Sequence, residues 1–179
     1  MHNSGNRRLD LVAFMGALCL FFSTIEYLFP KPFPFFRLGL ANLPVLLSLD
    51  LFAPGYVLLL VALKVIGQGL VNGTLASYVF LFSVAGSLAS ALVMLLVHRA
   101  GRRWITLIGV SLFGSLASNV VQVSLSVTFI FGQTAWVIAP AFLALGVASG
   151  LAVGLFAQRF RMRSRWFASL REQFDGSKT

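Results

Sequence analysis

The sequence predicts an all-α integral membrane protein, built as a bundle of six transmembrane helices. Hydrophobic residues make up 58% of the 179 residues and charged residues only 11%, whereas soluble domains average about 45–50% and about 25%. The apolar residues form continuous runs, without the alternating pattern of membrane β-strands. A chain of this length has room for about six spans of roughly 20 residues each, so we expect a single membrane domain over residues 1–179.

Six apolar runs define the expected membrane helices. The second and third runs have about 15 residues each, so either is long enough only for a short span or a re-entrant segment. The fifth run is longer than a bilayer requires and has to tilt, kink or emerge. A basic tail, residues 161–179, is expected to extend the last helix into solvent. The expected spans are residues 11–29, 38–52, 56–70, 78–97, 104–131 and 135–160.

Basic residues outnumber acidic residues by 14 to 5, and their positions follow the positive-inside rule. They gather before the first span, between the fourth and fifth spans, and after the sixth span. These three regions share one side of a six-span bundle, and the opposite side has only Lys31 and Arg37. We therefore expect cytoplasmic termini in a multi-pass protein of the cytoplasmic membrane. The basic tail is expected to bind anionic membrane lipids, and not nucleic acid.

Cysteine and histidine give no indication of a metal site. Cys19 is the only cysteine, which excludes an intramolecular disulfide and a cysteine-based metal cluster. The two histidines, His2 and His98, are far apart in sequence, and no further ligands accompany them. The sequence therefore predicts no metal and no cofactor.

Polar residues inside the apolar runs are the first indication of function. Lys64 lies within the third run, where a charge is costly in lipid and implies a protein-lined or watery pocket. The alternative for Glu26 is a paired charge that neutralises Lys64 or Arg37, and for Asn119 and Gln122 it is an interhelical hydrogen bond. Because these polar residues favour the outer half of the bundle, we expect a ligand pocket that opens outward. Its candidate substrate-binding residues are Glu26, Arg37, Asn42, Lys64, Gln68, Asn72, Asn119 and Gln122.

Small residues recur at four-residue intervals, which lets membrane helices approach closely. Ala13 and Ala17 form such a pair in the first run, and Gly146, Gly150 and Gly154 form a stripe in the sixth. One explanation is packing within the bundle. The other is that one of these faces docks another membrane protein.

The stretch RLGLANLPVLLSLDLF, residues 37–52, resembles the heptaprenyl diphosphate synthase component I family, also called the Gx transporter family. That family is in turn similar to the substrate-binding S components of energy-coupling factor (ECF) transporters. The resemblance covers about residues 25–160 and includes the pieces IEYLFP, ALKVIGQGL, SVAGSLASALVM and GVSLFGSLASNVVQ. Members usually carry arginine where Lys64 stands and histidine where Ser118 stands. The first departure keeps the charge but loses the bidentate geometry of arginine.

The resemblance implies an S-component-like fold in a bacterial inner membrane, with a small-molecule substrate held on the extracellular side. Its implied partners are a transmembrane coupling subunit and ATPases, because S components have no ATPase of their own. The Ala13 and Ala17 pair matches in kind the motif by which S components dock. The chain agrees in lacking a phosphate loop of the form G-x-x-x-x-G-K-[ST].

The synthase name implies a different role. Prenyl chain elongation uses clustered aspartates that hold magnesium against diphosphate oxygens, whereas Asp10, Asp50 and Asp175 are widely spaced. We therefore do not expect the chain to be an enzyme by itself. Three hypotheses follow: a substrate-binding subunit for uptake, which we favour; a non-catalytic membrane component of polyprenyl diphosphate or quinone synthesis, working with a soluble prenyl synthase subunit; and a structural subunit of a membrane redox complex.

Overall fold

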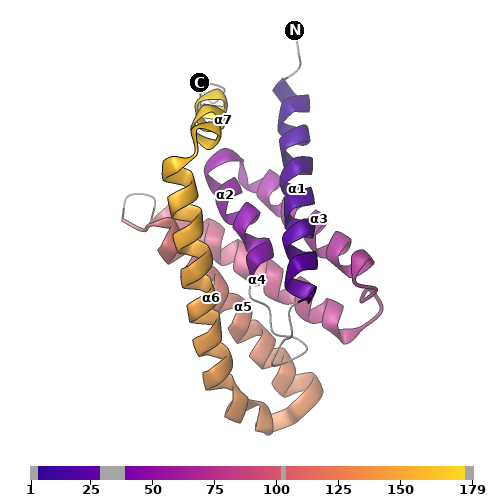
Figure 1. The fold of residues 1–179 in the computed structure, drawn as a ribbon. Coiled ribbons are helices and arrows are strands. Elements are labelled where there is room, and N and C mark those ends of the chain that lie inside the picture. Colours follow the sequence, from indigo (N-terminus) through magenta and orange to yellow (C-terminus); the bar gives the residue numbers. More distant parts are fainter. Residues whose placement is uncertain (1–3, 29–38, 102–103, 176–179) are drawn as a thin grey trace.

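A computed structural model describes residues 4–28, 39–101 and 104–175 of the protein (Figure 1). These residues form helices and short connections, and no strand occurs within those three ranges. A 3-10 turn, Leu40–Asn42, leads directly into α2. The helices are α1 (Ser4–Leu28), α2 (Leu43–Leu51), α3 (Pro54–Val71), α4 (Tyr78–Ala100), α5 (Leu107–Ser126), α6 (Ala135–Arg163) and α7 (Arg165–Asp175).

The helix boundaries fall at residues that favour a start or a reversal. Pro54 lies in the first turn of α3, where its missing N–H leaves no hydrogen bond unmade. The Thr106 hydroxyl caps α5 and accepts a hydrogen bond from the Gly109 N–H at 3.4 Å. After α5, a π-helical turn leads to Gly132, which has a φ of 55°. Only glycine adopts this region readily, and the chain reverses there into α6 (Figure 1).

The helices enclose α2. α5 packs along both α4 and α6, and α1 packs against α3. α2 lies among them, and eight of its nine residues are buried. The start of α1 and the whole of α7 lie at the same end of the molecule (Figure 1).

α2 does not confirm the expected span over residues 38–52, for which a re-entrant segment was the alternative. The whole apolar stretch Leu40–Leu51 would be about 18 Å long at 1.5 Å per residue, which is too short for a hydrocarbon core of about 30 Å. Its apolar character instead reflects burial against the other helices. The structure therefore does not show a bundle of six spans.

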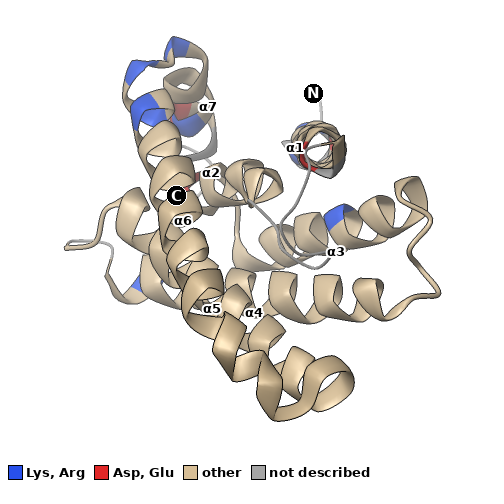
Figure 2. Ribbon diagram, turned by 60° about the horizontal axis from the view of Figure 1, so that its bottom comes forward, with Lys and Arg blue, Asp and Glu red and all other residues tan. Residues whose placement is uncertain are grey.

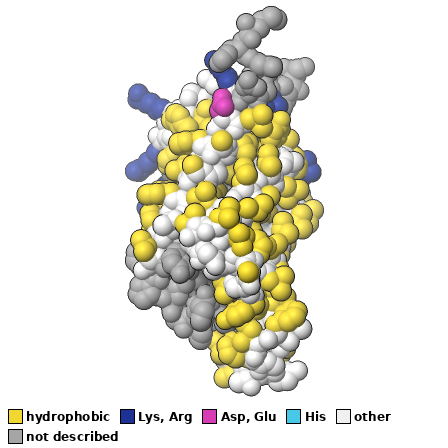
Figure 3. Space-filling model, turned by 90° about the vertical axis from the view of Figure 1, so that its right-hand side faces the viewer, with side chains coloured by type: hydrophobic (Ala, Val, Ile, Leu, Met, Phe, Trp, Pro, Cys, Tyr) yellow, Lys and Arg dark blue, Asp and Glu magenta, His cyan; other side chains and the backbone are white. Residues whose placement is uncertain are grey.

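Long apolar helices match the other expected spans. Among the described residues, four stretches are long and apolar enough to cross a bilayer: Arg7–Glu26, Pro54–Val71, Tyr78–Ala100 and Leu107–Arg163. The last stretch includes both α5 and α6. Hydrophobic side chains spread over the face shown in Figure 3, while the basic ones lie in its upper part. The helices are thus compatible with a multi-pass membrane protein.

The basic tail is more than a solvated extension of the last helix. Ser164 ends α6 in an extended conformation, and α7 follows as a separate helix that packs against α2. Phe167 of α7 is only 1% exposed. The ring of Trp166 meets that of Phe14 on α1 edge to face, with centroids 5.9 Å apart. α7 is therefore docked on the bundle through its apolar side.

The glycine stripe of α6 faces α5. The Ser111 hydroxyl donates to the Gly150 carbonyl at 2.8 Å, and the Ser115 hydroxyl donates to the Gly146 carbonyl at 2.7 Å. A Cβ on Gly154 would lie 2.8 Å from the Cα of Ile108. Since α5 covers this face, packing within the chain accounts for the stripe, and the face is not open to a partner.

The other pair of small residues lies on a different kind of surface. Ala13 and Ala17 are both exposed on α1. Docking of a membrane partner on this pair stays a prediction.

Candidate functional site: a polar cavity around Lys64

A small polar cavity lies inside the bundle, between α1, the 3-10 turn, α3, α4 and α5. Its volume is about 30 Å³, which is room for a water molecule or two. The structure brings six of the eight candidate residues together at its walls. These residues are Glu26, Asn42, Lys64, Gln68, Asn119 and Gln122.

The Lys64 ammonium is held by the 3-10 turn. Its Nζ donates a hydrogen bond to Oδ1 of Asn42, and only 4% of the lysine is exposed. Gly39, which begins the turn, has a φ of 76°, in the left-handed region that favours glycine. The Gly39 N–H donates to Oε1 of Glu26 at 3.1 Å. The GLAN sequence therefore connects a carboxylate on α1 with an ammonium on α3.

Opposite charges line this cavity. Glu26 is 3% exposed and Lys64 is 4% exposed, so both are removed from the surface of the protein. Buried ions are stable only when they are compensated and hydrogen bonded. Their shared cavity makes mutual compensation available, which was the alternative interpretation for this pair.

The α5 side of the cavity supplies amides. Nδ2 of Asn119 donates to the Phe142 carbonyl of α6 at 3.4 Å, and Nε2 of Gln122 donates to the Ser118 hydroxyl at 2.9 Å. Oε1 of Gln122 is buried and accepts no hydrogen bond from any described residue. A buried acceptor of this kind usually binds a water molecule or a ligand donor.

The two remaining candidates are placed differently. Arg37 lies outside the described residues. Asn72 is the C-cap of α3, is partly exposed, and is not among the residues that line the cavity. The structure therefore does not bring Asn72 into the site.

Sequence reasoning missed the serines of the cavity wall. Ser115 and Ser118 precede Asn119 and Gln122 by four residues each, so the same helix face carries all four. That spacing is a signal that could have found them. Ser87 of α4 and the turn residues Gly39 and Ala41 complete the lining, and no comparable spacing pointed to them.

The chemistry available here is recognition of a small polar or anionic group. One cation, one carboxylate, three hydroxyls and four amides, from the 3-10 turn, α3 and α5, converge on it. Among the described residues, no three of His, Cys, Asp and Glu are placed to hold a metal ion. At about 30 Å³ the cavity has room for a water molecule or two, and a larger ligand requires the surrounding helices to separate.

Apolar helices around a small polar cavity are compatible with a multi-pass membrane protein that has an internal binding site. The sequence matches the family model of heptaprenyl diphosphate synthase component I over residues 15–160. The chain belongs to this family, which confirms the resemblance seen in the sequence. The matched segment contains all the residues that line the cavity. No curated protein and no solved structure matches the chain.

Proposed function

We propose that the chain is a non-catalytic membrane component of polyprenyl diphosphate synthesis, working with a soluble prenyl synthase subunit. Family membership carries the proposal, because the family is named for one component of heptaprenyl diphosphate synthase. The sequence supports a division of labour between components. Its five acidic residues include no aspartate cluster of the kind that holds magnesium on a diphosphate, so the soluble subunit supplies the chemistry.

The charge distribution supports docking of that subunit at the end of the molecule that carries α7. Lys and Arg residues gather on α7 and the adjoining end of α6, whereas α3 carries Lys64 alone (Figure 2). By the positive-inside rule this end faces the cytoplasm. A growing prenyl chain gains about 0.8 kcal/mol for each CH₂ group that enters an apolar phase. A membrane component beside the enzyme gives the product a direct route into the bilayer.

A second candidate function is capture of a small molecule for uptake, as in S components of ECF transporters. The observation that favours it is the Lys64 cavity, which lies at the start of α2, away from the basic end. In this role the cavity opens toward the outside, and a coupling subunit docks on the exposed pair Ala13 and Ala17. The unpartnered Oε1 of Gln122 supplies an acceptor for the ligand.

Native mass spectrometry of the protein, purified in mild detergent from its own cells, distinguishes the two functions. The proposal predicts that a soluble prenyl synthase subunit co-purifies with the wild-type chain. The second candidate predicts a small bound ligand that is lost in Lys64→Met but retained in Asn72→Ala, a control outside the cavity. If a small ligand is recovered without any synthase subunit, uptake replaces polyprenyl diphosphate synthesis as the proposed function. If neither is recovered, both functions are contradicted.

A further inference from the structure

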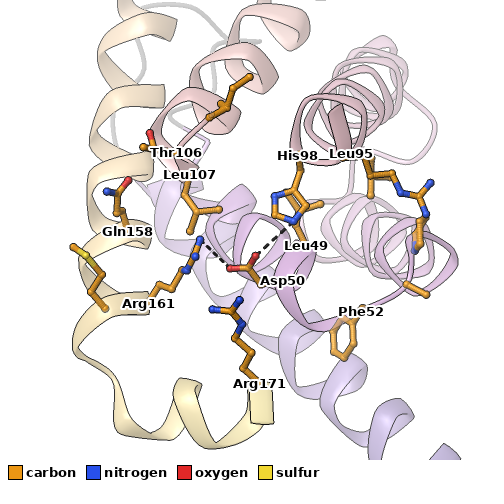
Figure 4. A pocket seen from close by; sticks show the side chains of 15 residues that line it. Leu49, Asp50, Phe52, Leu95, His98, Thr106, Leu107, Gln158, Arg161 and Arg171 are labelled. Atoms are coloured by element: carbon orange, nitrogen blue, oxygen red, sulfur yellow. Dashed lines mark ion pairs between the residues drawn. The ribbon is translucent and has the colours of Figure 1, made fainter. Parts of the chain in front are cut away.

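A second and larger pocket lies at the opposite end of α2, at the end of the molecule that carries α7. Asp50, in the last turn of α2, has its carboxylate 3.5 Å from Nε2 of His98 and 3.2 Å from Nη1 of Arg161 (Figure 4). Residues near the ends of α2, α3, α4, α5, α6 and α7 form the walls. The volume is about 610 Å³, within the range of about 300–1,000 Å³ that is typical of small-molecule sites. We call it the Asp50 pocket.

Positive charge exceeds negative charge in the Asp50 pocket. Its lining includes Arg99, Arg161 and Arg171, and Asp50 is the one acidic residue among the lining residues. Figure 4 shows the guanidinium of Arg171, from α7, directed toward Asp50 from the side opposite His98. Arg99 and Arg171 are exposed, so solutes can reach these cations. Asp50 pairs with Arg161 at 3.2 Å, and three arginines against one aspartate leave the lining with a net positive charge that favours an anion.

Two helix N-termini add to this positive potential. Pro54 opens α3 and Leu107 opens α5, and both residues line the pocket. The positive end of the helix dipole lies at the N-terminus of a helix and favours a bound anion there. Helix dipoles and arginines therefore act in the same direction.

Apart from Thr106 and Gln158, the rest of the wall is mainly apolar. Leu49, Phe52, Leu95, Ile105 and Met162 contribute to it. A free inorganic anion has no apolar part that could be buried against this surface, whereas an amphiphile can pack its first carbon atoms against it. Arginine is the side chain best suited to the phosphate end, because its planar fork of donors matches phosphate oxygens.

We propose that the Asp50 pocket binds the phosphate or diphosphate head of an amphiphile that resides in the membrane. An anionic phospholipid and a prenyl diphosphate share this chemistry. The prenyl diphosphate version rests on the proposed function and names its site: the diphosphate end lies at the basic end of the bundle, and the prenyl chain runs toward the lipid. The Lys64 cavity, at about 30 Å³, is too small for such a head group in this structure.

Isothermal titration calorimetry of the full chain in dodecyl maltoside tests the proposal with three probes: farnesyl diphosphate, dioleoylphosphatidylglycerol and inorganic diphosphate. At least one amphiphile is expected to bind more tightly than inorganic diphosphate. Its affinity is expected to fall about tenfold or more in R161Q and in R171Q, as for a lost hydrogen bond to a charged group. The matched control is R163Q, since Arg163 is exposed on the same turn of α6 and does not line the pocket.

The relative affinities distinguish the two possible ligands, a prenyl diphosphate and an anionic phospholipid. Preference for farnesyl diphosphate assigns the site to prenyl diphosphates, and preference for phosphatidylglycerol assigns it to a lipid head group. Preference for phosphatidylglycerol still supports the Asp50 pocket as a binding site. The proposed function is then tested separately, by whether the synthase subunit co-purifies. Failure of both amphiphiles to bind, or equal losses in R163Q and R171Q, would overturn the proposal. R171Q leaves the Asp50–Arg161 ion pair in place, so its result does not depend on that contact.

Discussion

Replacing Gly154 by alanine is expected to lower the free energy of unfolding by about 1–3 kcal/mol, as is typical of overpacked interiors. The new Cβ would lie 2.8 Å from the Cα of Ile108 and 3.3 Å from its carbonyl oxygen. These are backbone atoms of α5, so no side-chain rotation relieves the contact. The two helices have to separate, which also lengthens the serine-to-carbonyl hydrogen bonds between them. Unfolding by SDS in mixed micelles measures the change.

Gly55→Ala is the matched control for Gly154→Ala. Gly55 lies in the first turn of α3, and a Cβ there meets nothing within 4 Å. Its effect on unfolding is expected to stay within about 0.5 kcal/mol, as for most surface substitutions. Equal losses in the two variants would contradict the close α5–α6 packing.

Replacing Lys64 by methionine is expected to lower the free energy of unfolding by about 3 kcal/mol. The substitution removes one of two buried opposite charges and leaves the other uncompensated. Methionine keeps the length of the side chain but leaves Oδ1 of Asn42 without the lysine donor. It also leaves the buried carboxylate of Glu26 without the opposite charge across the cavity. The same SDS titration measures the loss.

A double-mutant cycle tests whether the two charges compensate each other. Adding Glu26→Gln to Lys64→Met is expected to recover about 1–3 kcal/mol, as for residues that share one electrostatic network. Strictly additive losses would show that Glu26 and Lys64 are stabilised by different partners.

The sequence was informative about helices and uninformative about which of them face lipid. Continuous apolar runs correctly predicted helices in all six regions. For the run that contains α2 the sequence left a short span and a re-entrant segment open, because a helix that is apolar on all sides fits a protein interior as well as a bilayer. The docking of α7 was missed for a related reason: Phe167 stands among charged residues, and only the tertiary structure shows that it is buried.

The Lys64 cavity was largely predictable, and the Asp50 pocket was not. Polar groups are costly in lipid, so Lys64, Asn119 and Gln122 stand out in apolar runs. Serines do not, because a serine is common in apolar helices, where its hydroxyl can hydrogen bond to the backbone of its own helix; Ser126, outside the cavity, does so to the Gln122 carbonyl at 2.8 Å. The arginines of the Asp50 pocket were explained by the positive-inside rule alone. Their convergence on two helix N-termini depends on packing between distant segments.

The rate of prenyl transfer by the co-purified soluble subunit, measured in lipid vesicles with and without this chain, tests the central claim most directly. The account predicts that vesicles containing this chain alone are inactive, and that adding it to the soluble subunit raises the rate about tenfold or more. A soluble subunit that is equally active in empty vesicles would contradict a role for this chain in polyprenyl diphosphate synthesis.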